Sequence, residues 1–512
     1  MTYRTLDEIR ETLSPAEERF ERARRTTGLW LAPLTGAGVW LAASGLPGAQ
    51  RGLAAILGVV VVAWITEAVP IPMTATLGLA LCVLTGVAPA AEVFGAFANP
   101  TIFLLIGSFV IAEAMTRHGL HRRFAYRMLS LPGVAASTHR TIIVFGVTTM
   151  ALSAFVSNTA TTAMLLPTAL GVVSALSGFM TAGGPAGSAR PRFAAATMLM
   201  LAYSASIGGL LTPIGSPPNL IGRRLIEDAT GRPIPFFTWV AAAAPIVLVM
   251  FAVLCVVLLR LNRPESRRID GAAAYVAAER ARLGRMSAGE RNALVAFGTA
   301  VTLWVLPGVV ALAAGDDSAA YRDVLAHLDE GAVAVLAAVL LFVLPVDWRA
   351  RRFTLTWNEA VRIDWGTILL FGSGIALGGL MSRTGLAASV GDGVAGLLGA
   401  SSTLGLTVLA TVVAIVISET TSNTASVGVV VPIILPIAAA AGVDPVVPAL
   451  AAIFGASYGF MLPVSTPPNA IVYGSGMVPI GRMLRSGLVF DVLGAIVIVA
   501  GVTLMARLAG LA

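Results

Sequence analysis

The sequence predicts an all-α polytopic membrane protein whose two halves are inverted repeats of each other. Three observations lead to this fold class: long apolar segments with very few charges, arginines concentrated in a few loops, and three motifs that each occur twice in the same order. Because the repeated motifs are polar and interrupt apolar segments, each half is expected to contain a broken helix and a re-entrant hairpin whose tip is a Ser-Asn-Thr sequence.

The composition excludes a water-soluble protein. The chain has 512 residues, of which 57% are hydrophobic and 12% are charged, whereas soluble domains contain about 25% charged residues. Segments 53–69 and 246–259 carry no ionisable side chain except Glu67. Each is long enough to cross much or all of a bilayer core of about 30 Å. The chain is therefore expected to be a multi-pass membrane protein.

The net charge of +7 does not indicate a nucleic-acid partner. All 34 basic residues are arginines, and cytoplasmic loops of membrane proteins carry an excess of such residues. The two cysteines, Cys82 and Cys255, lie in apolar segments, where small buried hydrophobic side chains are expected and no disulfide framework can form. The four histidines lie in or beside loops, so the sequence shows no zinc-ligand cluster.

Two of the apolar segments are too long for single spans. The segments are expected at 29–47, 52–69, 70–90, 99–116, 141–177, 193–230, 235–260, 292–313, 330–346, 364–388, 401–441, 444–479 and 486–511. Polar motifs interrupt 141–177 and 401–441, and we interpret both as re-entrant hairpins that return to their starting side. Polar motifs also interrupt 193–230 and 444–479, which we interpret as broken helices.

The arginines set the expected topology. With the N-terminus inside and each hairpin counted as no crossing, most arginines fall in inside segments, including eight in 260–291. This topology places the C-terminus outside, opens the first hairpin inward and opens the second hairpin outward. The expected divisions are a charged cytoplasmic arm without a signal peptide (1–28), a first repeat (29–260), an Arg-rich cytoplasmic linker (261–291) and a second repeat (292–512).

Two sequences are typical of helix starts. Ser14-Pro15-Ala16-Glu17 is a capping box with proline at the first helical position, and it should begin a helix in the N-terminal arm. Ser287 and Glu290 form a second capping box at the end of the linker, which should begin the next helix.

Three motifs occur once in each half. Leu-Leu-Ile-Gly-Ser ending at Ser108 is repeated as Leu-Leu-Phe-Gly-Ser ending at Ser373, and Ser-Asn-Thr-Ala occurs at 157–160 and 422–425. The distance from Gly107 to Asn158 is 51 residues, as is the distance from Gly372 to Asn423. A Pro-Pro-Asn motif follows at 217–219 and 467–469. Interrupted helices at corresponding positions of inverted repeats indicate the binding site of a secondary transporter.

These motifs can bind an anion without any basic side chain. Ser, Asn and Thr cap helix N-termini, and proline fits the first helical turn, so four helix N-termini are expected to face a common point. Free N–H groups at such N-termini attract anions, and the remaining hydroxyl and carbonyl oxygens suit sodium. The alternative is that the motifs only form tight turns. Glu419, an acid within a membrane segment, is a candidate either for function or for a hydrogen-bonded structural role.

At these motifs the sequence resembles the divalent anion–sodium symporter family, over roughly residues 29–511. The paired Ser-Asn-Thr motifs, each followed by Pro-Pro-Asn, carry the resemblance. It implies about eleven transmembrane helices with two re-entrant hairpins. It also implies a homodimer, and an elevator mechanism in which a transport domain bearing the hairpins slides against a fixed scaffold.

The resemblance also implies the site residues. The positions that match the family's substrate-binding residues are Asn158, Thr159, Ser216, Asn423, Thr424, Thr466 and Pro467. The positions that match its first sodium site are Ser153, Ser157, Asn158 and Gly215. The positions that match its second sodium site are Ser418, Thr421, Asn423 and Ser465.

The expected function is sodium-coupled import of a C4 dicarboxylate such as succinate, malate or fumarate across the bacterial inner membrane. Sodium-independent dicarboxylate exchange, and transport of citrate or of an inorganic divalent anion such as sulfate, remain alternatives within transport. An intramembrane enzyme is disfavoured because the membrane segments supply no histidine or lysine for catalysis. A sensor is disfavoured because the arm and the linker are too short for a signalling domain. Membrane lipids are the only other partners expected.

Overall fold

The computed structural model describes residues 15–181, 192–267, 272–315, 317–390 and 402–508. These residues form an almost entirely helical protein, as the sequence predicts. Eight of the described helices are each long and apolar enough to cross a membrane, or nine with the bent pair α14 and α15. The chain is therefore a membrane-embedded, multi-pass helical protein. The expected number of eleven spans stays a prediction.

The helices of the first half begin with α1 (Pro15–Ala42), α2 (Gly48–Thr66), α3 (Ile71–Leu84), α4 (Ala90–Gly95) and α5 (Pro100–Arg117). They continue with α6 (Leu120–Leu129), α7 (Thr138–Ser153), α8 (Asn158–Thr181), α9 (Arg192–Gly209), α10 (Pro217–Thr230) and α11 (Phe236–Leu261). The helix α1 runs through position 28 without a break. The charged arm and the first apolar segment are thus one helix, which begins at Pro15 as expected; Ser14 lies outside the described residues.

The helices of the second half begin with α12 (Ala272–Arg282), α13 (Ala288–Ala314), α14 (Ala319–His327) and α15 (Glu330–Val343). They continue with α16 (Trp357–Ala360), α17 (Trp365–Thr384), α19 (Thr403–Thr420), α20 (Asn423–Ala440), α21 (Val446–Ala456), α22 (Pro467–Gly474) and α23 (Ile480–Leu508). The predicted capping box is confirmed, because Ser287 and Glu290 bond each other's backbone N–H at the start of α13.

The structure contains two features that the apolar segments of the sequence do not predict. A short antiparallel ribbon of β1 (Pro345–Asp347) and β2 (Arg352–Phe353) connects α15 to α16 in the otherwise helical chain. The short helices α6, α12 and α14 lie between the predicted apolar segments, where the sequence predicts no membrane helix. They are too polar or too short to be seen as apolar segments, so hydropathy alone does not reveal them.

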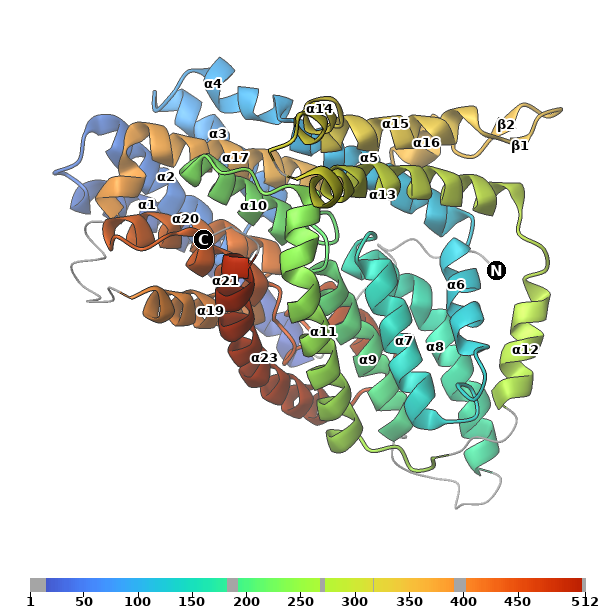
Figure 1. Cartoon of the computed structure of the whole chain (residues 1–512). Helices are drawn as coiled ribbons and strands as arrows, with labels where there is room; N and C mark the ends of the chain where they lie inside the picture. Colours follow the sequence, from blue (N-terminus) through green and yellow to red (C-terminus); the bar gives the residue numbers. More distant parts are fainter. Residues whose placement is uncertain (1–14, 182–191, 268–271, 316, 391–401, 509–512) are drawn as a thin grey trace.

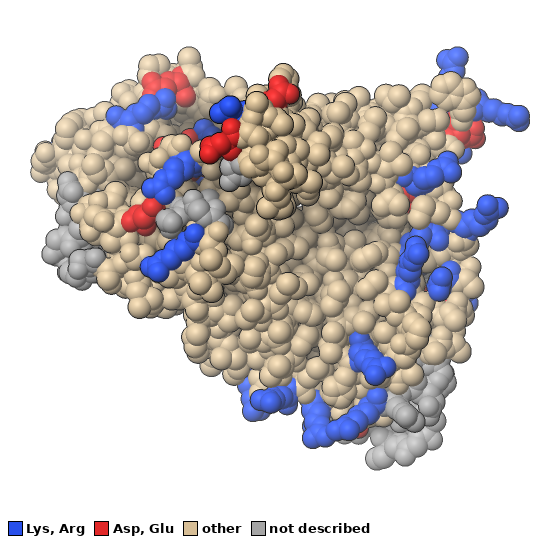
Figure 2. Space-filling model, viewed as in Figure 1, with Lys and Arg blue, Asp and Glu red and all other residues tan. Residues whose placement is uncertain are grey.

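The helices lie in two groups that cross each other. Figure 1 shows α5, α13, α15 and α17 lying along the top of the view, with α7, α8, α9, α11 and α23 running steeply below them. The contacts follow this arrangement, since α5 packs on α15, α3 on α17, and α7 on α9. In Figure 2 the arginines on this face lie along the lower and right margins and, together with acidic residues, at the upper left, while the broad middle of the face is almost uncharged.

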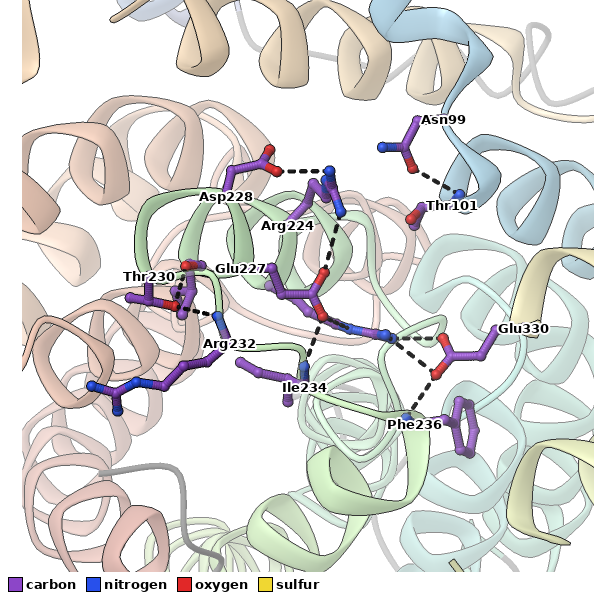
Figure 3. A network of polar contacts seen from close by, with 12 residues as sticks. Asn99, Thr101, Arg224, Glu227, Asp228, Thr230, Arg232, Ile234, Phe236 and Glu330 are labelled. Carbon is purple, nitrogen blue, oxygen red and sulfur yellow. Dashed lines mark hydrogen bonds and ion pairs between the residues drawn. The ribbon is translucent and has the colours of Figure 1, made fainter. Parts of the chain in front are cut away.

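One largely buried ion network joins α10 to α15 and to the start of α11. Arg223 of α10 bonds Glu227 on its own helix at 3.0 Å and Glu330 at the start of α15 at 2.7 Å. Each glutamate also accepts a backbone N–H, from Ile234 and Phe236 respectively, in the segment that leads into α11 (Figure 3). Because every charge in the network has a partner, it can be buried without leaving an unpaired group.

Candidate transport site

Each Ser-Asn-Thr motif ends one helix and begins the next. The first lies between α7 and α8, where the Ser157 hydroxyl accepts the backbone N–H of Ala160. The second lies between α19 and α20, where the Ser422 hydroxyl accepts the N–H of Ala425. Both bonds measure 3.2 Å and satisfy an N–H in the first turn that has no partner within the helix. The predicted capping role of these serines is confirmed.

In the first half, three oxygen atoms meet around a single hydroxyl hydrogen. The Ser153 Oγ at the end of α7 lies 2.7 Å from Asn158 Oδ1 and 2.7 Å from the carbonyl oxygen of Ala205 in α9. We call these three atoms the first oxygen cluster. The one hydroxyl hydrogen can be donated to only one of the two acceptors at a time. The cluster therefore presents more lone pairs than hydrogens, which favours a hard cation such as sodium.

The second half contains a matching arrangement. The Ser418 Oγ lies 2.8 Å from Asn423 Oδ1 and 2.7 Å from the carbonyl oxygen of Ala456 at the end of α21. We call these atoms the second oxygen cluster. In both clusters the serine lies five residues before the asparagine, and the carbonyl comes from the first half of a broken helix. The sequence repeat is thus reproduced as repeated geometry around the hairpin tips.

The other residues expected at the first sodium site lie nearby with different tasks. Gly215 is buried in the break between α9 and α10, where its backbone N–H bonds the Thr212 hydroxyl at 3.1 Å. A Cβ at Gly215 would lie 2.6 Å from the Gly209 carbonyl and 2.9 Å from the Ala154 carbonyl. Several carbonyl oxygens thus surround the first oxygen cluster, whereas Ser157 already uses its hydroxyl as a helix cap.

At the expected second sodium site, the hydroxyls of Thr421 and Ser465 already donate hydrogen bonds to other protein groups. The Thr421 hydroxyl donates to the carbonyl of Ile417 at 2.8 Å and so completes the end of α19. The Ser465 hydroxyl, in the break between α21 and α22, lies 2.6 Å from the carboxylate of Glu419. Glu419 therefore has a hydrogen-bonded structural role in this break, although the sequence left its role open.

The expected substrate-binding residues differ in their exposure. Asn158, Thr159, Asn423 and Thr424 are half-buried at the first turns of α8 and α20. Ser216 and Thr466 are buried at the N-caps of α10 and α22. Thr466 uses its hydroxyl to accept the Asn469 N–H, whereas Ser216 makes no such cap bond. Pro467 is exposed at the first position of α22.

The asparagines of the two Pro-Pro-Asn motifs hold the broken helices in shape. The Asn219 Nδ2 donates to the carbonyls of Gly209 and Thr212 at 2.7 and 2.8 Å. The Asn469 Nδ2 donates at 3.0 Å to the carbonyls of Gly459 and Leu462, at the same sequence offsets. Asn219 and Asn469 are part of the repeated motif in the sequence, but the sequence alone assigned them no role. Their identical positions after the double proline are the signal that could have indicated a shared structural role.

The helix contacts connect the two halves around these motifs. The half-helix α10 packs against α20 of the second hairpin, and α22 packs against α8 of the first hairpin. Each broken helix therefore contacts the hairpin of the other half. This crossed packing brings elements that are more than 190 residues apart in sequence into one region.

Comparisons with known proteins show the family of this chain. Residues 28–510 match the family model of the sodium:sulfate symporter transmembrane region. The chain is 32% identical over 438 residues to the sodium-dependent dicarboxylate transporter SdcS of Staphylococcus aureus, covering 85% of this chain and 82% of that protein. The chain belongs to the divalent anion–sodium symporter family. The prediction that it is a transporter and not an enzyme is therefore confirmed.

Two solved structures share the fold at low sequence identity. The MtrF efflux pump of Neisseria gonorrhoeae has a TM-score of 0.54 at 13% identity and covers 83% of each chain. The YdaH transporter of Alcanivorax borkumensis has a TM-score of 0.52 at 13% identity, covering 82% of this chain and 88% of its own. These similarities show a shared transporter fold and carry no information on the substrate.

Proposed function

We propose that the chain is a secondary active transporter that imports C4 dicarboxylates, such as succinate, malate or fumarate, together with sodium across the bacterial inner membrane. The observation that carries this proposal is the pair of matched oxygen clusters at the two hairpin tips. Both consist of neutral oxygens that suit sodium, and both lie at helix N-termini that suit a carboxylate. The S. aureus relative is named a sodium-dependent dicarboxylate transporter, which supports the same combination of ions.

In this proposal the two clusters bind sodium, and the hairpin tips bind the substrate. Sodium at the first site would be held by oxygens of Ser153, Ser157, Asn158 and Gly215, and at the second by those of Ser418, Thr421, Asn423 and Ser465. The substrate carboxylates would be bound by Asn158, Thr159, Ser216, Asn423, Thr424, Thr466 and Pro467. Because both asparagines belong to both sets, sodium binding orients the side chains that the substrate needs.

The proposed movement is an elevator within a homodimer. The hairpins and broken helices would slide together against a scaffold formed by the remaining helices, which carries the bound ions across the membrane. The buried network between Arg223 and Glu330 joins α10 to α15 across these two groups, so it would have to open during such a movement. The proposed orientation has the N-terminus in the cytoplasm and the C-terminus outside.

The test is uptake of radiolabelled succinate into proteoliposomes that contain the purified protein. The conditions are an inward sodium gradient, potassium in place of sodium, and vesicles preloaded with unlabelled succinate. Accumulation that requires the sodium gradient is the expected result.

Two other results would replace the proposal with a named alternative. Uptake that ignores sodium but needs internal succinate would make the protein an exchanger. The family description names sulfate, so absence of succinate uptake with sodium-driven uptake of sulfate or citrate would assign one of those anions instead.

A further inference from the structure

Asp491 of α23 is a buried acid without a partner. Its side chain is 5% exposed, and neither carboxyl oxygen has a hydrogen-bond partner among the described residues. A charged carboxylate in this position is strongly disfavoured, because buried charges require pairing and acids within membrane segments are costly. A positive charge beside this side chain would therefore stabilise it.

The groups around Asp491 come from three other parts of the chain. The carboxyl of Glu419 in α19 faces it, together with the main chain of Phe460. Asp491 also interacts electrostatically with Tyr458, after α21, and with Tyr203, in α9. Within α11, which also packs against α23, the only charged residue is Arg260 in the last turn, and α21 carries none. No basic side chain therefore forms an ion pair with Asp491 in the part of the chain that the structure describes.

The carboxyl group of the neighbouring Glu419 accepts three hydrogen bonds. One of its oxygens accepts the backbone N–H groups of Phe460 and Met461 at 2.5 and 2.9 Å, and the other accepts the Ser465 hydroxyl at 2.6 Å. These donors satisfy both carboxyl oxygens of Glu419. Asp491 faces the same carboxyl group, so two acidic side chains lie together without a basic partner among the described residues.

The Tyr458 hydroxyl supplies an independent observation. Tyr458 is fully buried, its hydroxyl has no hydrogen-bond partner among the described residues, and it interacts electrostatically with Asp491. The Tyr203 hydroxyl, by contrast, donates to the Phe460 carbonyl at 2.6 Å. Buried polar groups are normally bonded, so an open tyrosine oxygen beside an open carboxyl points to a missing ligand between them.

We propose that Asp491, Glu419 and the Tyr458 hydroxyl form a binding site for one positive charge, a proton or a sodium ion, in addition to the two sodium sites proposed above. The carboxyl and hydroxyl oxygens are hard ligands that suit either cation. The site belongs to the second half only, because Ala154 occupies the position equivalent to Glu419 and α11 contains no acidic residue.

The site is connected to the second proposed sodium site through Glu419. Ser465, a proposed sodium ligand, donates its hydroxyl to the same carboxylate that faces Asp491. A positive charge at Asp491 therefore weakens the negative field that Glu419 exerts on the second site. The two hairpin regions would differ in their cation binding for this reason, despite their matched oxygen clusters.

The experiment measures the site directly on the purified full-length protein. Infrared spectroscopy at neutral pH detects the carbonyl band of a buried protonated carboxyl group, and radioactive sodium counts the sodium ions bound per chain at saturation. The variant is Asp491→Asn. The matched control is Asp444→Asn, because Asp444 forms a more exposed ion pair with Arg232. Neither measurement uses transport, so the result does not depend on the substrate.

The two cations give different results. If the ligand is a proton, the wild type shows the carboxyl band, saturating sodium does not remove it, and Asp491→Asn loses it. If the ligand is sodium, the wild type lacks the band in saturating sodium, and Asp491→Asn binds one sodium ion fewer. If Asp491→Asn changes neither the band nor the sodium count, the proposal is wrong.

A second variant covers the possibility that Asp491→Asn does not fold. Tyr458→Phe keeps the ring that packs against Phe460 and Phe490, with centroids 4.9 and 5.3 Å away, and removes only the hydroxyl. It should shift the frequency of the carboxyl band if the site binds a proton, or lower sodium affinity several-fold if it binds sodium. An unchanged band together with unchanged sodium affinity would overturn the site as proposed.

Discussion

At the scale of single residues, Asn158 and Asn423 have the same task in the two halves. Each places its Oδ1 against a serine hydroxyl at the end of the preceding helix, at 2.7 and 2.8 Å. Each also lies in the first turn of a helix, where free N–H groups point toward the tip. One side chain thus contributes to an oxygen cluster and stands beside a potential anion site.

Replacing either asparagine should therefore remove transport without unfolding the protein. We expect Asn158→Ala and Asn423→Ala each to abolish succinate uptake into proteoliposomes, because each change removes an oxygen from a proposed sodium site and a contact from the proposed substrate site. Size-exclusion chromatography and thermal unfolding of the purified variants check the fold. Asn358→Ala, on the exposed face of α16, is the control that should transport normally. Retained uptake in either tip variant would refute the assignment.

Gly209 and Gly459 occupy matching positions but tolerate a side chain differently. A Cβ at Gly209 would collide with the amide of Asn158, whereas a Cβ at Gly459 would lie 3.1 Å from Ser418 Oγ, a tight contact. We expect Gly209→Ala to displace the Asn158 amide. The contact between the Asn158 oxygen and sodium, about 1.5–3 kcal/mol, would be lost, and the apparent sodium affinity would fall by roughly tenfold or more.

Sodium-dependent uptake, measured over a range of sodium concentrations, tests this prediction. Gly459→Ala should have a smaller effect, and Gly38→Ala in α1, where nothing lies within 4 Å of the new atom, should have none. Equal effects of Gly209→Ala and Gly38→Ala would contradict the packing argument.

At the scale of elements, the broken helices owe their shape to side-chain bonds. Asn219 and Asn469 satisfy the carbonyls that the missing helical turns leave free. Unpaired backbone groups at membrane depth are costly, so these amides make the breaks possible. The double prolines then start the second half-helices, in which the missing N–H is no loss.

The Arg223 network is the element-scale contact that fixes α10 to α15. Arg223→Met should leave the largely buried Glu330 without a basic partner and Glu227 with only Arg224 at 3.8 Å, at a cost of about 3–5 kcal/mol. The melting temperature of the purified protein in detergent should fall clearly. Arg232→Gln, which removes a more exposed pair with Asp444, should change stability by at most about 1 kcal/mol.

The double variant separates an unpaired charge from lost packing. Arg223→Met combined with Glu330→Gln removes the charge that the single variant leaves without a basic partner, so it should be more stable than Arg223→Met alone. Melting temperatures that are equal for the single and double variants would show that the charge of Glu330 is not the cause.

At the scale of the whole molecule, the arrangement of the arginines predicts the orientation in the membrane. In a background of Cys82→Ala and Cys255→Ala, we expect Arg282→Cys in α12 to react with a membrane-impermeant maleimide only from the cytoplasmic side. Asp323→Cys in α14 should react only from outside. The side chains of Arg282 and Asp323 are both largely exposed, so only the membrane should decide from which side the maleimide can reach each cysteine. Labelling of both positions from the same side would overturn the proposed topology.

The sequence by itself determined the fold class and located the hairpin tips. Apolar segments must be helical in a bilayer, and Ser-Asn-Thr and Pro-Pro-Asn are local signals for helix starts, which the structure places at Asn158, Asn423, Pro217 and Pro467. Local chemistry decides such features, so they can be read from neighbouring residues. The short helices α6, α12 and α14 were missed because no apolar segment reveals them.

Only the tertiary structure decided which distant groups meet. Four such contacts join residues that lie between 38 and 107 positions apart in sequence and share no motif. They are the ion pair of Arg223 with Glu330, the contacts of Ser153 and Ser418 with the carbonyls of Ala205 and Ala456, and the facing carboxyls of Glu419 and Asp491. Such contacts depend on helix packing and on backbone atoms, and neither leaves a pattern in the order of the side chains. The sequence therefore indicates where the chain breaks in the membrane, and packing determines which oxygens and charges the breaks bring together.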